Sequence, residues 1–259
     1  MPRLTNHLVK SLLFALACAA AISTFAAPDT NSVFSKRAEA EFQRTKQLYW
    51  TNANNPSNAW VFASACYDLT EFAPTEARRG EIAKLGIAAC QQLVTREPKS
   101  AAGHYYLGMN YGELAEAEAP SLAAYRLVHE VEREFKTAQA LDEKVDFAGP
   151  ARCLGLLYRD APGWPLSIGN KWKAREQLER ADKLAPGYPE NQLNLAESFL
   201  QWRDSEEAEK SLKKLETTWH SAQTNLTGAA WEKSWRDWAV RRAGAKAEFQ
   251  KLFKRVPGT

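Results

Sequence analysis

Valine and isoleucine are scarce in this chain of 259 residues, which holds 9 Val and 4 Ile against 42 Ala and 27 Leu. β-Branched residues favour strands, whereas alanine and leucine lose little side-chain freedom in a helix. No hairpin dipeptide lies between segments of alternating polarity. We therefore expect an all-α protein, and the composition argues against an all-β or doubly wound fold.

Histidine and cysteine are also few, at four residues each, and there is no Cys-x-x-Cys pair. A zinc ribbon or a dithiol redox motif is therefore unsupported. His129 and Glu130 do not begin a zinc-protease motif, because position 133 is Arg, and no nucleophile elbow or phosphate-binding loop is present. His104 and Glu113 could be read as an acid–base pair, but a packed helical histidine is the commoner role. We predict no enzymatic activity and no cofactor.

Charge of one sign is not in excess. Thirty-four Lys and Arg against 31 Asp and Glu give a formal net charge of +3. Nucleic-acid-binding domains are usually far more basic than this. We therefore expect no nucleic-acid partner.

The N-terminus has the pattern of a secretory signal peptide. Arg3 and Lys10 precede an uncharged stretch over residues 11–27 that ends in small residues. Cleavage after Ala26 removes two basic and no acidic residues, so the remaining chain carries 3 − 2 = +1. A membrane-spanning anchor would need about 20 apolar residues. Residues 15–18 (ALAC) resemble a loose lipobox, so we expect periplasmic export, with a lipid anchor at Cys18 as the alternative.

Three cysteines remain after cleavage: Cys66, Cys90 and Cys153. Export to an oxidising compartment permits a disulfide, and Cys66 and Cys90 fall on successive expected helices. The alternative is that they are small buried apolar residues. Spacing does not decide between these, because a disulfide needs Cα atoms within about 7 Å.

Apolar residues recur at helical spacing along most of the chain, with prolines near the helix ends. The pattern predicts helices over residues 35–49, 58–72, 75–96, 100–117, 121–141, 148–159, 170–184, 189–203, 204–217 and 228–254.

Small and large residues alternate along these helices as in a tetratricopeptide repeat, a helix pair in which small residues let the two helices approach closely. The clearest unit begins at Leu154, Gly155 and Tyr158 and ends at Pro186. Similar units begin 44, 47 and 41 residues apart, at positions 63, 107, 154 and 195. We therefore predict an α-solenoid of about four hairpins with an extra helix at each end. The expected domains are a signal peptide (1–26), an N-terminal helix and turn (27–57), a repeat domain (58–217) and a C-terminal capping-helix region (218–259).

Several segments carry a resemblance to a known family. They are residues 104–110 (HYYLGMN), 149–158 (GPARCLGLLY), 161–165 (APGWP), 167–169 (SIG) and 188–191 (YPEN). Together they resemble the TatT family, the T component associated with TRAP transporters, over about residues 58–217. The resemblance implies a periplasmic or lipid-anchored helical-repeat protein that cooperates with a periplasmic solute-binding protein. Some members form ring-like trimers, so a homotrimer is also implied.

Repeats of this kind usually expose fixed positions of the first helix to a concave groove. Arg152 and Arg159 are seven residues apart, hence on one helical face, and their guanidinium groups could bind a carboxylate. We therefore expect a small amphipathic or anionic ligand near them. The alternative is that Arg159 pairs with local carboxylates and that Arg152 lies on a solvated face. The residues expected to bind the ligand are Tyr105, Met109, Arg152, Leu156, Arg159, Trp164 and Glu197.

Tryptophan is abundant, at nine residues, and two features stand out, a single Trp in an insertion and a row of three Trp near the C-terminus. Trp164 lies in the insertion 159–171 (RDAPGWPLSIGNK), which can form a binding edge or lid, or place Trp164 as a plug between helices. Trp231, Trp235 and Trp238 form one helical stripe, which can be a docking face or, more commonly, the apolar face of a capping helix.

These observations predict an exported, non-catalytic binding protein that supports solute uptake. It would bind a small amphipathic or anionic ligand, a periplasmic solute-binding protein, or both. The alternative is a periplasmic tetratricopeptide scaffold for protein–protein interaction in envelope assembly. In that alternative the groove would take a peptide.

Overall fold

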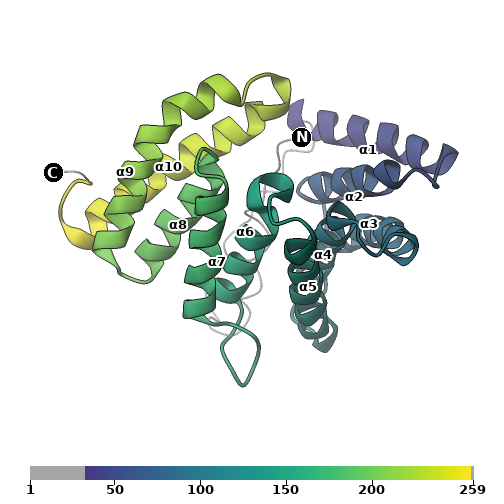
Figure 1. Ribbon diagram of the computed structural model, residues 1–259, viewed down its shortest axis with the longest axis horizontal. Helices are drawn as coiled ribbons and strands as arrows, with labels where there is room; N and C mark the ends of the chain where they lie inside the picture. The colour runs from purple at the N-terminus through teal and green to yellow at the C-terminus, as the bar shows by residue number, and fades with distance from the viewer. Residues whose placement is uncertain (1–32, 258–259) are drawn as a thin grey trace. The chain divides into compact units, whose positions relative to one another are not determined.

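The structure is a computed structural model that describes residues 33–257, and over these residues it is a succession of packed α-helices with no β-strand element. This confirms the expected all-α, solenoid-like fold (Figure 1). The described residues divide into two compact units. The N-terminal unit holds residues 33–145 and 160–168, and the C-terminal unit holds residues 146–159 and 169–257.

The N-terminal unit is built from five helices. They are α1 (Val33–Thr51), α2 (Pro56–Thr70), α3 (Glu76–Arg96), α4 (Ala101–Ala117) and α5 (Leu122–Leu141). Side chains at the N-caps of α2 to α5 accept a hydrogen bond from a backbone N–H of the first turn, which explains where these helices begin. The capping residues are Asn55, Thr75, Ser100 and Ser121.

Each helix of the N-terminal unit packs on the next one, and α2 also contacts α4 (Figure 1). Phe42, Phe62 and Leu93 are among the buried residues of its core. Gly108 of α4 faces Phe135 of α5 so closely that a Cβ at position 108 would lie 2.7 Å from the ring. The glycine therefore sets how closely these two helices approach, as the repeat pattern predicts.

The C-terminal unit contains most of α6 (Val145–Asp160), followed by α7 (Lys171–Leu184), α8 (Pro189–Gln201), α9 (Ser205–Asn225), the 3₁₀ helix η1 (Ala229–Trp231) and α10 (Glu232–Phe253). Gly155 of α6 faces Leu178 of α7, and a Cβ at position 155 would lie 2.6 Å from Leu178 Cγ. The helices α8, α9 and α10 pack on one another (Figure 1).

The start of α6 is irregular. Asp146, Phe147 and Ala148 have left-handed backbones, with φ of 50°, 55° and 63°. The right-handed helix begins only after them, so Pro150 lies in its first turn, where a missing N–H is tolerated. The expected helix over residues 148–159 therefore begins at about the predicted place, but an unpredicted left-handed turn precedes it.

One expected boundary is wrong. Helix α9 continues to Asn225, eight residues beyond the predicted end at 217, so the division at 217/218 falls inside this helix. The extension buries Trp219 and Ala222 against the C-terminal aromatic cluster. The predicted signal peptide and Cys18 lie outside the described residues. Among the helices that the structure describes, none has the length and apolarity needed to cross a membrane.

The cysteines are small buried residues and do not form a disulfide, which is the second of the two alternatives. Cys66, Cys90 and Cys153 are buried thiols, and the disulfide considered between Cys66 and Cys90 is not formed in the structure. Cys66 packs among Phe42 and Phe62. Burial raises the pKa of both the Cys66 and Cys90 thiols, which keeps them protonated and unreactive.

Candidate functional site

Arg152 is fully buried, with 0% of its side chain exposed, and its guanidinium binds groups of its own unit. It forms an ion pair with Asp146 at 2.9 Å and donates to the backbone oxygens of Asp146 and Phe147 at 3.1 Å each. It also donates to Asn191 Oδ1 at 3.1 Å and lies over the Tyr188 ring. The alternative that Arg152 lies on a solvated face is therefore wrong.

These contacts explain how the left-handed turn at the start of α6 is stabilised. Left-handed backbone costs a residue with a side chain about 1–2 kcal/mol. Arg152 binds two carbonyls of the turn, and Asn191 Nδ2 donates to one of them, Phe147 O, at 3.1 Å. The Phe147 ring stacks on Tyr188 with centroids 4.4 Å apart. Arg152 thus has a structural task that the sequence pattern did not indicate.

Arg159, the other arginine expected to bind a carboxylate, is half-buried at the end of α6. It donates to Ser198 Oγ of α8 at 3.0 Å. Leu156, between the two arginines, is buried. Both arginines therefore contact groups of their own unit, and an anionic ligand here would have to compete with those contacts.

Glu197 binds an arginine from α10. Arg241 Nε and Nη2 each donate to the Glu197 carboxylate at 2.8 Å. The same guanidinium donates to Glu190 Oε1 at 2.6 Å and to Asn194 Oδ1 at 2.7 Å. Trp238, also on α10, donates from its indole nitrogen to the second oxygen of Glu190. The face of α8 expected to line a groove is thus covered by α10.

Two opposing effects act on the buried Arg241. Removal from water disfavours its charged form, but the attraction of Glu190 and Glu197 and their hydrogen bonds prevail and raise its pKa above the ordinary value. The arginine therefore stays charged, and the pair of carboxylates is neutralised from within the unit.

The tryptophan stripe of α10 packs in the same place. Trp238 is buried with Tyr188 and Trp219, and Trp231 and Trp235 pack against this cluster while half-buried. An exposed docking stripe is therefore excluded, and the packing is what a capping helix requires.

Tyr105 and Met109, expected to bind the ligand from the first helix of a hairpin, are fully buried in α4. The Tyr105 ring contacts Tyr106 and Phe135, with centroids 5.0 and 5.9 Å apart. Both residues are part of the core of the N-terminal unit.

A buried acidic pair on α4 was not predicted as a unit. Glu113 and Glu116 are 2% and 5% exposed, and both approach Arg79 of α3. Arg79 donates to Glu116 at 2.9 Å, and its Nε lies 3.8 Å from Glu113. Burial, which outweighs the effect of Arg79, raises the pKa of Glu113 to about 7 and that of Glu116 well above its ordinary value. One arginine thus faces two carboxyl groups in a dry environment.

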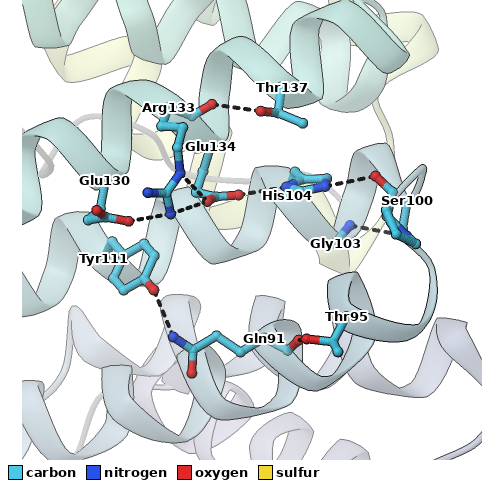
Figure 2. Close-up of polar contacts among 11 residues, drawn as sticks. Gln91, Thr95, Ser100, Gly103, His104, Tyr111, Glu130, Arg133, Glu134 and Thr137 are labelled. Carbon is cyan, nitrogen blue, oxygen red and sulfur yellow. Dashed lines mark hydrogen bonds and ion pairs between the residues drawn. The ribbon is translucent and has the colours of Figure 1, made fainter.

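His104 pairs with Glu134 of α5 rather than with Glu113. Figure 2 shows the ring beside the Glu134 carboxylate, which Arg133 also contacts. His104 Nδ1 lies 2.6 Å from Glu134 Oε2, and Nε2 lies 3.0 Å from the Pro98 carbonyl oxygen. Both ring nitrogens are thus engaged by protein oxygens. This geometry is that of a histidine that ties α4 to α5.

The loop between α6 and α7 carries two exposed apolar side chains. Trp164 is 88% exposed and Leu166 is 68% exposed. The alternative of Trp164 as a plug between helices is therefore wrong. The Gly163 carbonyl accepts from the N–H groups of Leu166 at 3.0 Å and Ser167 at 3.3 Å, so the tip has its own turn.

The structure thus distributes the seven expected ligand-binding residues over different environments. Tyr105, Met109, Arg152 and Leu156 are buried, Arg159 and Glu197 bind partners within their unit, and Trp164 is exposed. No group of three or more His, Cys, Asp or Glu among residues 33–257 is arranged to hold a metal ion. No protein-family model matches the chain, and no curated protein shows significant sequence similarity to it.

Proposed function

We propose that this chain is an exported, non-catalytic binding protein that supports solute uptake, in the manner of the T component of TRAP transporters that its sequence resembles. Its partner is a periplasmic solute-binding protein, and it also binds a small amphipathic or anionic ligand. The glycine-against-large-residue packing of α4 on α5 and of α6 on α7 supports a tetratricopeptide-like framework for this function.

The exposed Trp164 carries the proposal. From Ala161 to Ile168 the loop has no charged side chain, and its tip holds Trp164 and Leu166 in water. Burying one large apolar side chain contributes about 1.5–3 kcal/mol, and Trp is among the residues enriched at binding hot spots. A loop of this composition is suited to insertion into an apolar depression on a partner protein.

The contacts of the arginines favour docking through the loop over anion binding at α6. Arg152 and Arg159 are engaged by Asp146 and Ser198, whereas the side chain of Trp164 is in solvent. We therefore assign the partner contact to the loop.

The experiment is quantitative cross-linking in the source cells. The tagged chain, a Trp164→Ala variant and a Trp50→Ala variant are expressed at equal levels, and the captured proteins are identified by mass spectrometry. Trp50 is the matched control because it is an exposed tryptophan, 68% exposed, on α1.

The proposal predicts that a solute-binding protein is captured by the unmodified chain and by Trp50→Ala, and that Trp164→Ala loses most of it. Capture that is equal in all three proteins would contradict docking through the loop. Capture of envelope-assembly proteins in place of a solute-binding protein would favour the scaffold alternative.

A further inference from the structure

A pocket of about 540 Å³ lies in the N-terminal unit, where α1 and α3 begin and α2 ends. Its floor is apolar: Leu69 and Ile82 are buried, and Phe72 beside them is half-buried. Pockets that bind small molecules usually have volumes of about 300–1,000 Å³ and a largely apolar lining. The space is therefore of the size that a small ligand needs.

Charged side chains of both signs line the same pocket. Lys36 and Glu39 come from α1, and Arg78 comes from the first turn of α3. The two cations are also near the N-terminal ends of their helices, where the helix dipole favours an anion. The lining thus offers two cations for an anionic group and one carboxylate for a cationic group.

The partners that the structure describes for Arg78 and Glu39 are weak. Arg78 pairs with Glu81 at 2.9 Å, with both side chains at least 46% exposed. Glu39 accepts a hydrogen bond from Gln43 at 2.7 Å on the exposed surface of α1. Exposed pairs of this kind contribute about 0–1 kcal/mol, so a ligand can replace them at small cost.

We propose that this pocket binds a small zwitterion with an apolar side chain, such as a free aromatic or branched-chain amino acid. Its carboxylate lies between Lys36 and Arg78, its ammonium group faces Glu39, and its side chain rests on Leu69, Phe72 and Ile82. Lys36 and Arg78 hold the carboxylate because charge-assisted hydrogen bonds are stronger than neutral ones. Glu39 makes the site selective for a ligand that also carries a positive charge.

This inference rests on the small-ligand half of the proposed function and replaces the arginines of α6 as the place where the ligand binds. The pocket is formed by α1, α2 and α3, whereas docking is assigned to the loop between α6 and α7. Loss of ligand binding and loss of partner capture are therefore separate results.

The test is isothermal titration calorimetry of the purified protein with L-phenylalanine. Two analogues remove one charge each: 3-phenylpropionate lacks the ammonium group, and phenethylamine lacks the carboxylate. The variants are Arg78→Gln, Glu39→Gln and the pocket-filling Ala73→Trp. Lys84→Gln is the matched control, because it removes an exposed cation of α3 that does not line the pocket.

We expect L-phenylalanine to bind more tightly than either analogue. Arg78→Gln and Glu39→Gln should each weaken the affinity for L-phenylalanine by about tenfold, equivalent to about 1.4 kcal/mol. We expect Glu39→Gln to reduce the difference between the dissociation constants of L-phenylalanine and 3-phenylpropionate. Ala73→Trp should abolish the binding of L-phenylalanine, and Lys84→Gln should leave its dissociation constant unchanged. The inference is overturned if L-phenylalanine fails to bind the folded protein at millimolar concentration, or if Ala73→Trp and Arg78→Gln bind it as the unmodified protein does.

Discussion

Replacing Arg241 by methionine removes the cation that joins α10 to α8. Four hydrogen bonds of 2.6–2.8 Å disappear, to Glu190, Asn194 and Glu197. Glu190 is 1% exposed, so its carboxylate is left without a compensating charge. Removing one partner of a buried ion pair costs about 3–5 kcal/mol. Trp238 still donates to Glu190 and the Glu197 side chain is 24% exposed, so we expect the lower end, about 3 kcal/mol.

The assay is equilibrium unfolding in urea at pH 7, followed by far-ultraviolet circular dichroism. A second substitution, Glu190→Gln, tests whether the uncompensated charge of Glu190 causes the loss. With Arg241 already replaced, it removes this charge and should recover at least about 1 kcal/mol of the free energy of unfolding. Arg236→Met is the matched control, because this arginine of α10 is 58% exposed, and we expect a change within about 0.5 kcal/mol. A loss of stability for Arg241→Met no larger than that for Arg236→Met would contradict a stabilising role of the buried pair. Equal destabilisation of both backgrounds by Glu190→Gln would contradict it as well.

Three further predictions concern the glycine packing, the acidic pair and the loop. Gly155→Ala brings a Cβ within 3.1 Å of the Leu178 backbone nitrogen, so thermal unfolding should show a loss of about 1–3 kcal/mol in the free energy of unfolding. Gly187→Ala, whose Cβ meets no atom within 4 Å, should be nearly neutral, and equal effects of the two variants would exclude the close packing at Gly155. Burial raises the pKa of Glu113 from its ordinary value of 4.5 to about 7, so the folded protein holds a proton that the unfolded chain has released. The contribution of Glu113 to the free energy of unfolding should therefore be greatest below about pH 4.5 and fall by up to about 3 kcal/mol as pH rises through 7. In urea titrations at successive pH values, Glu113→Gln should flatten this part of the stability profile. Trp164→Ala should leave the melting temperature within about 1 °C, since its ring is in water, and a large drop would show that the loop supports the fold.

The helices could be predicted from the sequence because their signals are local. Ser100 and Ser121 cap the helices that follow them, and the observed starts at Ala101 and Leu122 lie within one residue of those expected. Gly155, which faces Leu178 in the structure, belongs to the clearest of the predicted repeat units. The end of α9 differs from the prediction because Trp219 stabilises the last turns through a cluster that includes Tyr188 and Trp238, which are distant in sequence.

The site residues were harder to predict because their partners are not local. Arg241 contacts Glu190 across 51 positions of sequence, and nothing in the spacing of either helix indicates that pair. Three left-handed residues without a glycine among them have no sequence signal, so the task of Arg152 could not be foreseen. The pocket escaped prediction for a similar reason, since its lining comes from three separate segments, over residues 35–39, 69–74 and 78–82.

Docking of a solute-binding protein on the loop that carries Trp164 is a proposal that a binding measurement can test. The most direct measurement is the dissociation constant between the purified chain and the purified solute-binding protein that it captures, determined for the unmodified protein, Trp164→Ala and Trp50→Ala. A buried tryptophan at a hot spot contributes 2 kcal/mol or more, so Trp164→Ala should weaken binding by roughly 30-fold, and Trp50→Ala should not change it. Equal dissociation constants for all three proteins would contradict docking through this loop.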